Sequence, residues 1–176
     1  MTDYTLQPIP GKTLSRRLPE GTALVLEGGG LRGYYSCGVM EAFMEKDLLF
    51  PYIIGVSAGA ANALSYISGQ PGRSREIIEH YVGNPDYVST RNLLTKHTMF
   101  DFDYIFGTVP EKHIFFDWDK FHEQDTRFLT GAMNCADGKT VWFEKDTLKA
   151  PFMASRASCS VPLITKIQHY LSLIHI

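Results

Sequence analysis

The chain has 176 residues, a length that suits one domain of ordinary size. Its composition, 44% hydrophobic and 20% charged with 15 Gly and 9 Pro, is typical of a globular protein and excludes a disordered, collagen-like or disulfide-stapled chain. Lys plus Arg number 17 against 19 for Asp plus Glu, so no charge excess draws the molecule to nucleic acid, and binding to nucleic acid is not expected.

The three cysteines, Cys37, Cys135 and Cys159, are far apart, and no Cys-x-x-Cys pair occurs. Neither a disulfide framework nor a zinc site is therefore expected. The sequence near Met1 has no apolar run behind a basic start, and nowhere is there a run of the ~20 apolar residues that a membrane span needs. A cytoplasmic location is the default expectation.

The predicted elements begin after residues 1–20, a polar leader for which we expect no regular structure. Thr22–Glu27 is a short apolar run between glycines, typical of a buried strand in a parallel sheet. Tyr34–Leu48 has the apolar spacing of an amphipathic helix. A second buried strand is predicted over Tyr52–Val56 and a second helix over Ala58–Ser68. Two successive strand-turn-helix units predict an α/β fold with a mostly parallel sheet.

The rest of the chain is predicted less completely. A third helix is expected over Arg73–Val82. Residues 98–121 hold eight aromatic rings, which favour core packing over an acyl-pocket wall or a flap that touches a membrane, but they predict no particular element. Arg127–Asn134 and Lys139–Glu144 are predicted to form a hairpin, and residues 150–162 a helix of small residues.

The first glycine motif, Gly28-Gly29-Gly30-Leu31-Arg32-Gly33, matches G-x-G-x-x-G between a predicted strand and a predicted helix. A dinucleotide-binding turn has this pattern and this context. The acidic residue that such a site needs after the second strand is missing, because that strand ends in Val56-Ser57, and Asp47 precedes the strand. A nucleotide-binding module that uses Gly28–Gly33 as a phosphate cradle remains an alternative.

The second motif, Gly55-Val56-Ser57-Ala58-Gly59, matches G-x-S-x-G, again between a strand and a helix. A serine in such a nucleophile elbow has an exposed hydroxyl, and the following helix N-terminus favours negative charge beside it. Because neighbouring parallel strands end at the same edge of a sheet, we expect the Gly28–Gly33 loop beside Ser57. The loop amides are then aimed at charge on an acyl carbonyl, with Arg32 adding positive charge. The alternative is that both loops are tight turns without chemistry.

Together the two motifs resemble those of the patatin-like phospholipase family of acyl hydrolases. The resemblance runs from about Thr22 to about Tyr170. It includes Asn134–Phe143, similar to the family's strand pair, and Ala154-Ser155 through Pro162, similar to its Ala-Ser-x-x-x-Pro stretch. The resemblance implies a three-layer α/β fold with a mostly parallel central sheet flanked by helices. It also implies lipid catabolism by a serine esterase or phospholipase that cleaves lipid or other carboxylic esters through an acyl-enzyme, without metal or cofactor.

The roles that the resemblance implies form a serine–aspartate dyad without histidine. Ser57 would be the nucleophile. The residues around it would form the elbow: Gly55, Val56, Ala58 and Gly59. The oxyanion hole would come from the first motif, with donor amides around Gly29, Gly30 and Leu31: Gly28, Gly29, Gly30, Leu31, Arg32 and Gly33. Transient contact with a membrane surface is expected of an enzyme with a lipid substrate.

The aspartate of the dyad is missing from its expected place. In the family it follows the Ala-Ser-x-x-x-Pro stretch in an Asp-Gly-Gly or Asp-Gly-Ala motif, whereas this sequence has no Asp or Glu after Asp146. We therefore expect residues 21–170 to be an incomplete domain without its C-terminal part, and residues 171–176 to be a foreign tail. Asp137 precedes the stretch and is expected to serve a turn. The chain itself is expected to hydrolyse p-nitrophenyl esters little or not at all.

Two further alternatives concern the catalytic groups. A serine triad would use a histidine that follows the serine, and the candidates are His80, His97, His113 and His122. In α/β-hydrolases, however, the nucleophile follows several strands, whereas Ser57 follows only two predicted ones. The other alternative is a pseudoenzyme that keeps the fold alone. Lipid class and oligomeric state are not predicted.

Overall fold

A central four-stranded sheet organises the computed structural model, which describes residues 8–150, 152–170 and 174–175. The strands lie in the order β2-β4-β5-β6: β2 (Ala23–Leu26), β4 (Tyr52–Val56), β5 (Arg127–Met133) and β6 (Thr140–Glu144). β2, β4 and β5 are parallel, and β6 pairs antiparallel with β5. The α/β prediction, the mostly parallel sheet and the hairpin are therefore confirmed.

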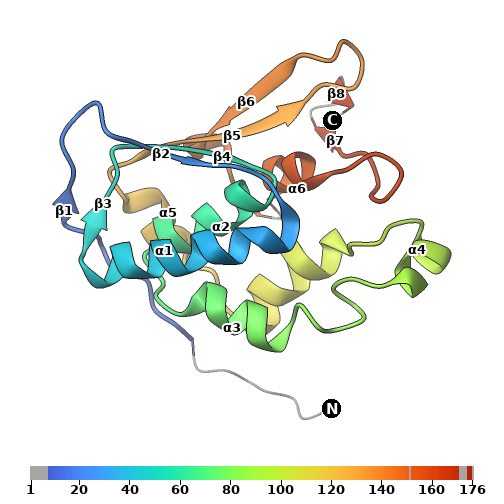
Figure 1. Ribbon diagram of the computed structural model, residues 1–176, viewed down its shortest axis with the longest axis horizontal. Helices are drawn as coiled ribbons and strands as arrows, with labels where there is room; N and C mark the ends of the chain where they lie inside the picture. Colours follow the sequence, from blue (N-terminus) through green and yellow to red (C-terminus); the bar gives the residue numbers. More distant parts are fainter. Residues whose placement is uncertain (1–7, 151, 171–173, 176) are drawn as a thin grey trace.

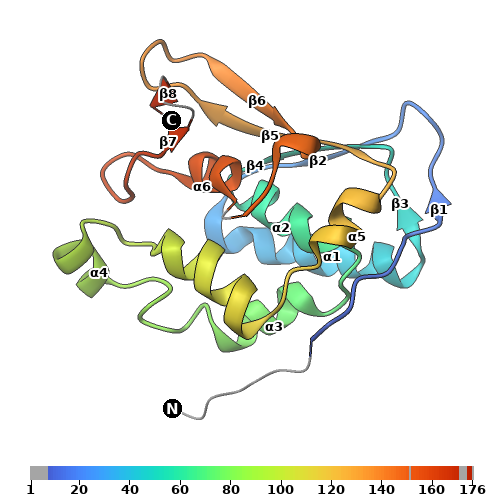
Figure 2. The ribbon, with the colours of Figure 1, turned by 180° about the vertical axis from the view of Figure 1, so that it is seen from behind.

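The helices lie on one side of this sheet (Figures 1 and 2). The helices of this layer are α1 (Tyr34–Glu45), α2 (Ala58–Ile67), α3 (Arg73–His80), α5 (Trp118–Glu123) and α6 (Met153–Cys159). The opposite face leaves Val25 68% and Trp142 48% exposed. The second helical layer of the expected three-layer fold is not found among the described residues.

The main core lies between α2 and the sheet. Ala60 and Ala63 of α2 are fully buried, as is Ile53 of β4. These two alanines let the helix approach the strands closely, because each carries only one methyl group between the helix and the sheet. The C-terminal ends of β2 and β4 are thereby held against the start of α2.

The aromatic stretch forms part of this core. It folds into a wide π-type helix, η2 (Tyr104–His113), followed by α5. Phe116 is 1% exposed, and its ring meets those of Trp118 and Phe152 edge to face with centroids 4.7 and 5.0 Å apart. The packing interpretation is therefore confirmed for the buried rings, which are Phe102, Phe106, Phe116 and Phe121.

The N-terminal segment corrects the expectation that residues 1–20 lack regular structure. β1 (Arg16–Arg17) pairs in parallel with β3 (Leu48–Leu49), and Leu14 is only 2% exposed. The helix predicted over Tyr34–Leu48 ends at Glu45, because Asp47 takes a positive φ of 60° and turns the chain into β3. Strands of two residues have no side-chain alternation from which to predict them. Residues 1–7 lie outside the described part.

Three smaller features complete the fold. α4 (Thr90–Lys96), which no pattern predicted, is capped by Ser89, whose side chain accepts a hydrogen bond from the Asn92 N–H, and η3 (Lys145–Thr147) follows β6. β7 (His169–Tyr170) pairs antiparallel with β8 (Ile174–His175). The expectation of a foreign tail over 171–176 stays a prediction, and 171–173 and 176 lie outside the described residues.

In the described part of the chain, no helix has the length and apolar character to cross a membrane.

Candidate active site

Ser57 lies at the sharp turn between β4 and α2, as its motif predicts. Its backbone has φ 52° and ψ −127°, a conformation that non-glycine residues rarely adopt. Backbone strain of this kind costs roughly 1–3 kcal/mol and persists only where the surroundings enforce it. The strain is therefore evidence that neighbouring groups hold Ser57 in place.

Two glycines of the elbow allow direct contact between backbones. A Cβ on Gly59 would lie 2.6 Å from the Glu27 carbonyl oxygen and still closer to that of Leu26. A Cβ on Gly55 would lie 2.6 Å from the Cα of Ala60. Distances of this kind are shorter than carbon atoms tolerate, so both positions require glycine. The start of α2 is thereby pressed against β2 and β4.

The first glycine motif lies beside Ser57. A Cβ built on Gly28 would be 3.0 Å from the Ser57 Cβ and 3.6 Å from its Oγ. Gly29 and Gly30 have φ values of 153° and 55°, which favour glycine, and the loop then enters η1 (Gly30–Gly33), a short 3₁₀ helix. The structure therefore brings the two predicted motifs together at the C-terminal ends of β2 and β4.

The loop is anchored at its far end and exposed at its centre. The Asn62 Nδ2 of α2 donates to the Gly33 carbonyl oxygen at 3.1 Å, and the Arg32 N–H donates to the Gly29 carbonyl oxygen at 3.2 Å. The bond from the Arg32 N–H is the first of the 3₁₀ turn. The amides of Gly29, Gly30 and Leu31 come before it in the chain, and N–H groups at such a helix start have no partner within the helix. These amides are therefore donors without a partner inside η1, on an exposed part of the loop. Arg32 is exposed at the same loop.

Sequence reasoning missed Ser158 of α6. The Ser57 N–H donates to the Ser158 Oγ at 2.7 Å, and the Ser158 hydroxyl donates to the Gly131 carbonyl oxygen of β5 at 2.5 Å. Ser155, which the sequence analysis placed in the Ala-Ser-x-x-x-Pro stretch, is also buried, but its hydroxyl has no partner in the described structure. With three residues between Ser and Pro, Ser158 and Pro162 fit that spacing, and this was the available signal.

Cys159 is the second neighbour that the sequence did not predict. Burial raises the pKa of its thiol to about 12, and a hydrogen bond with the Ser57 side chain offsets part of that rise. A thiol with such a pKa stays protonated near neutral pH, and the thiolate is the reactive form. Cys159 therefore contacts the candidate nucleophile without competing with it.

Cysteine reactivity provides a test of this local structure. At pH 8, iodoacetamide is expected to modify Cys135 of the native protein rapidly, because Cys135 is exposed. Cys159 and Cys37 are expected to react slowly, since burial raises the pKa of the Cys37 thiol as well, to about 11. All three thiols should react after unfolding in urea. Mass spectrometry measures the sites, and rapid native modification of Cys159 would contradict the raised pKa of this half-buried thiol.

No carboxylate hydrogen-bonds to Ser57 among the described residues. Asp137 lies between β5 and β6, where its Oδ1 accepts from the Lys139 N–H at 3.1 Å. Its side chain also forms an ion pair with Lys139 at 3.7 Å. The prediction that Asp137 serves a turn is therefore confirmed.

The four histidines of the alternative triad make other contacts. The His113 ring packs against Tyr81 with centroids 5.1 Å apart, and the His122 ring stacks on Trp118 at 5.8 Å. His97 ends α4 in the left-handed conformation. In the part of the chain that the structure covers, none of the four, His80 included, hydrogen-bonds to Ser57.

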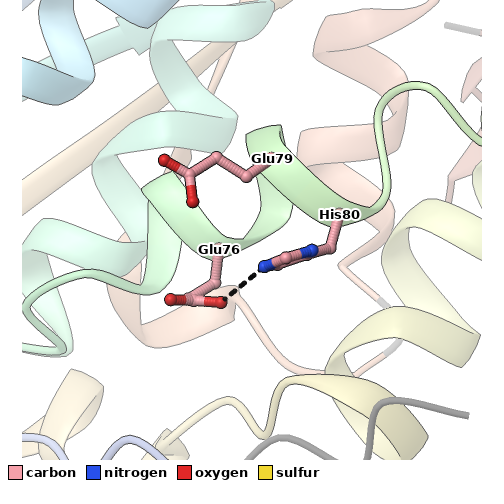
Figure 3. Close-up of side chains that lie close together, drawn as sticks. All are labelled: Glu76, Glu79 and His80. Carbon is pink, nitrogen blue, oxygen red and sulfur yellow. Dashed lines mark ion pairs between the residues drawn. The ribbon is translucent and has the colours of Figure 1, made fainter.

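His80 belongs to a cluster of possible metal ligands on α3, with Glu76 and Glu79. Figure 3 shows the His80 and Glu76 side chains pointing toward one another, with 3.3 Å between Nε2 and Oε2. Glu79 and His80 are exposed, and the pair with i,i+4 spacing is an ordinary helix-surface contact. The cluster gives no reason to assign a metal.

Comparison with known proteins finds similar sequences. A sequence model of the patatin-like phospholipase family matches residues 24–173. The chain is 33% identical to the uncharacterised protein YjjU of Escherichia coli K12 over 102 residues. These residues cover 57% of this chain and 29% of YjjU. The chain is 40% identical over 57 residues to the patatin-like phospholipase domain-containing protein CNBE2340 of Cryptococcus neoformans, 32% of this chain and 6% of that protein. The chain thus matches less than a third of the length of either relative.

Proposed function

Because this chain belongs to the patatin-like phospholipase family, a family of serine hydrolases, we propose that it carries the nucleophile and oxyanion hole of a lipid acyl hydrolase. One observation supports this proposal above the others. Ser57 occupies a strained strand-to-helix turn, and the Gly28 loop lies so near that a Cβ added to Gly28 would be 3.6 Å from the Ser57 Oγ. A serine that serves only as a turn residue needs neither the strain nor the adjacent loop of free amides.

In the proposed reaction, the Ser57 Oγ attacks the carbonyl carbon of a lipid ester and loses its proton. The alcohol part of the ester leaves with a proton, the acyl group remains on Ser57, and water then releases the fatty acid. The amides of Gly29, Gly30 and Leu31 stabilise the oxyanion, and Arg32 adds positive charge. The proton that Ser57 loses is balanced by the one that the departing alcohol gains, and no described carboxylate hydrogen-bonds to Ser57.

A fluorophosphonate probe separates this function from the nucleotide-binding alternative. We expect intact-mass spectrometry to detect one covalent adduct per chain, because the probe reacts with the nucleophile of serine hydrolases. We also expect ATP and NAD to leave the melting temperature unchanged, since no acidic side chain follows β4 to bind a ribose. Stabilisation by a nucleotide without any adduct would favour the phosphate cradle instead.

We further propose transient contact with a lipid surface through Phe115. Its ring is 53% exposed, the most open of the eight rings in 98–121. Gln70 and Arg73 fix its backbone by donating to the Phe115 carbonyl oxygen at 2.9 and 3.3 Å. The neighbouring Phe116 is buried and would not reach a membrane.

The change Phe115→Ser is expected to weaken binding to phosphatidylcholine vesicles roughly 5- to 10-fold, as partial loss of a buried phenyl ring would. Cosedimentation measures the bound fraction. The control is Leu94→Ser on α4, which also removes an exposed apolar side chain and should bind like the wild type. Equal binding by the Phe115 variant would contradict the membrane contact.

A further inference from the structure

We infer that Ser158 is a positioning residue that holds the nucleophilic serine at the end of the sheet, an inference that rests on the proposed function. The Ser158 hydroxyl accepts from the Ser57 N–H and donates to the Gly131 carbonyl oxygen. It therefore bridges the strand that carries the nucleophile and its neighbour β5. The two serines are 101 positions apart in the chain, and α6 brings them together.

The bridge takes the place of a bond that the sheet would otherwise make. Val56 and Gly131 are the last paired residues of β4 and β5. In a parallel ladder, the N–H after Val56 would donate directly to the carbonyl oxygen of Gly131. Ser57 turns away from the sheet at this point, and the Ser158 hydroxyl fills the gap by satisfying both groups. The turn is thus made without leaving a donor and an acceptor unpaired.

Loss of the bridge would act on a strained residue. Ser57 has φ 52° and ψ −127°, and no side chain caps the start of α2. An unpaired amide and an unpaired carbonyl oxygen in this part-buried place each favour relaxation of the turn. Because Oγ follows the backbone of its own residue, relaxation would move it relative to the Gly28 loop. Misplacement of a reacting atom by about 1 Å can cost 10²-fold in rate.

The chain offers a matched control and a conservative variant. Ser155 lies one turn earlier on α6, is fully buried and has an unpartnered hydroxyl, so Ser155→Ala removes the same atom from the same helix without breaking a bond. Ser158→Thr keeps the hydroxyl, and its added methyl has room because Ser158 lines a cavity of about 470 Å³ with Val56 and Trp142.

The experiment has two readouts, applied to the wild type and to Ser158→Ala, Ser158→Thr and Ser155→Ala. One is the rate at which a fluorophosphonate modifies Ser57. The other is hydrogen exchange of the Ser57 amide, read by mass spectrometry of overlapping peptides across the elbow. We expect Ser158→Ala to slow modification about 10- to 100-fold and to speed exchange at Ser57. Ser158→Thr should restore both, and Ser155→Ala should change neither.

The outcomes separate this inference from the proposed function. Modification of Ser158→Ala at the wild-type rate, or unchanged exchange of its Ser57 amide, would overturn the positioning role. An equal effect of Ser155→Ala would overturn it too, because the loss would then reflect general damage to α6. If no variant, wild type included, is modified, the proposed function fails, and the exchange comparison still decides whether Ser158 holds the turn.

Discussion

Replacing Ser57 with alanine is expected to lower covalent modification by a fluorophosphonate by a factor of roughly 10³ or more, because removal of a nucleophile leaves only the residual reactivity of other groups. The fold should survive the change. The Ser57 side chain is neither fully buried nor a cap of α2, and its hydrogen bond to Ser158 comes from the backbone N–H, which alanine keeps. Circular dichroism and urea unfolding check that Ser57→Ala is folded.

Single histidine-to-alanine variants serve as controls for the triad alternative. His97, His113 and His122 lie on other elements and do not hydrogen-bond to Ser57, so modification of these variants should proceed at the wild-type rate. A 10-fold or greater loss in one of them alone would revive a triad. Persistent modification of Ser57→Ala would place the reactive nucleophile elsewhere.

The substitution Gly59→Ala is expected to lower the free energy of unfolding by roughly 2–3 kcal/mol, a typical cost of overpacking a core. The added Cβ would meet the carbonyl oxygens of Leu26, the last residue of β2, and of Glu27, which follows it. Both are backbone atoms, which cannot move aside as the end of a flexible side chain can. α2 would have to shift away from the sheet and carry Ser57 with it. Chemical denaturation measures the loss, and slower modification of Ser57 should accompany it.

The control for Gly59 is Gly38, which lies within α1 with nothing within 4 Å of an added Cβ. There alanine should stabilise the protein by about 0.5–1 kcal/mol, because glycine weakens a helix interior. Equal stability of Gly59→Ala and Gly38→Ala would contradict the close contact between α2 and β2.

The elements around the motifs could be predicted because their signals are local. The strand over Tyr52–Val56 was predicted with its observed bounds, and that over Thr22–Glu27 within one residue at each end. Glycine next to a short apolar run marks both strand ends. The approach of the two motifs followed from parallel strand order alone, since such strands end at one edge of the sheet.

The features that sequence reasoning missed depend on contacts between distant segments. The β1–β3 pair is too short to show a pattern, and residues 98–121 fold around partners such as Phe152 rather than by any period of their own. Ser158 is 101 positions from Ser57, and only its distance to Pro162 marked it out from Ser155. The sequence therefore indicated the candidate nucleophile and its loop but not Ser158, whose hydroxyl accepts a hydrogen bond from the Ser57 N–H.

The most direct test of the account is to trap an acyl group on the chain. The protein is incubated with p-nitrophenyl butyrate for hours, because acylation is expected to be slow without the aspartate of the dyad, and is then quenched in acid, digested and sequenced by mass spectrometry. The account predicts one butyryl group, located on Ser57 and absent from Ser57→Ala. A butyryl group at another residue, or equal butyrylation of the wild type and Ser57→Ala, would contradict the assignment of Ser57 as the nucleophile.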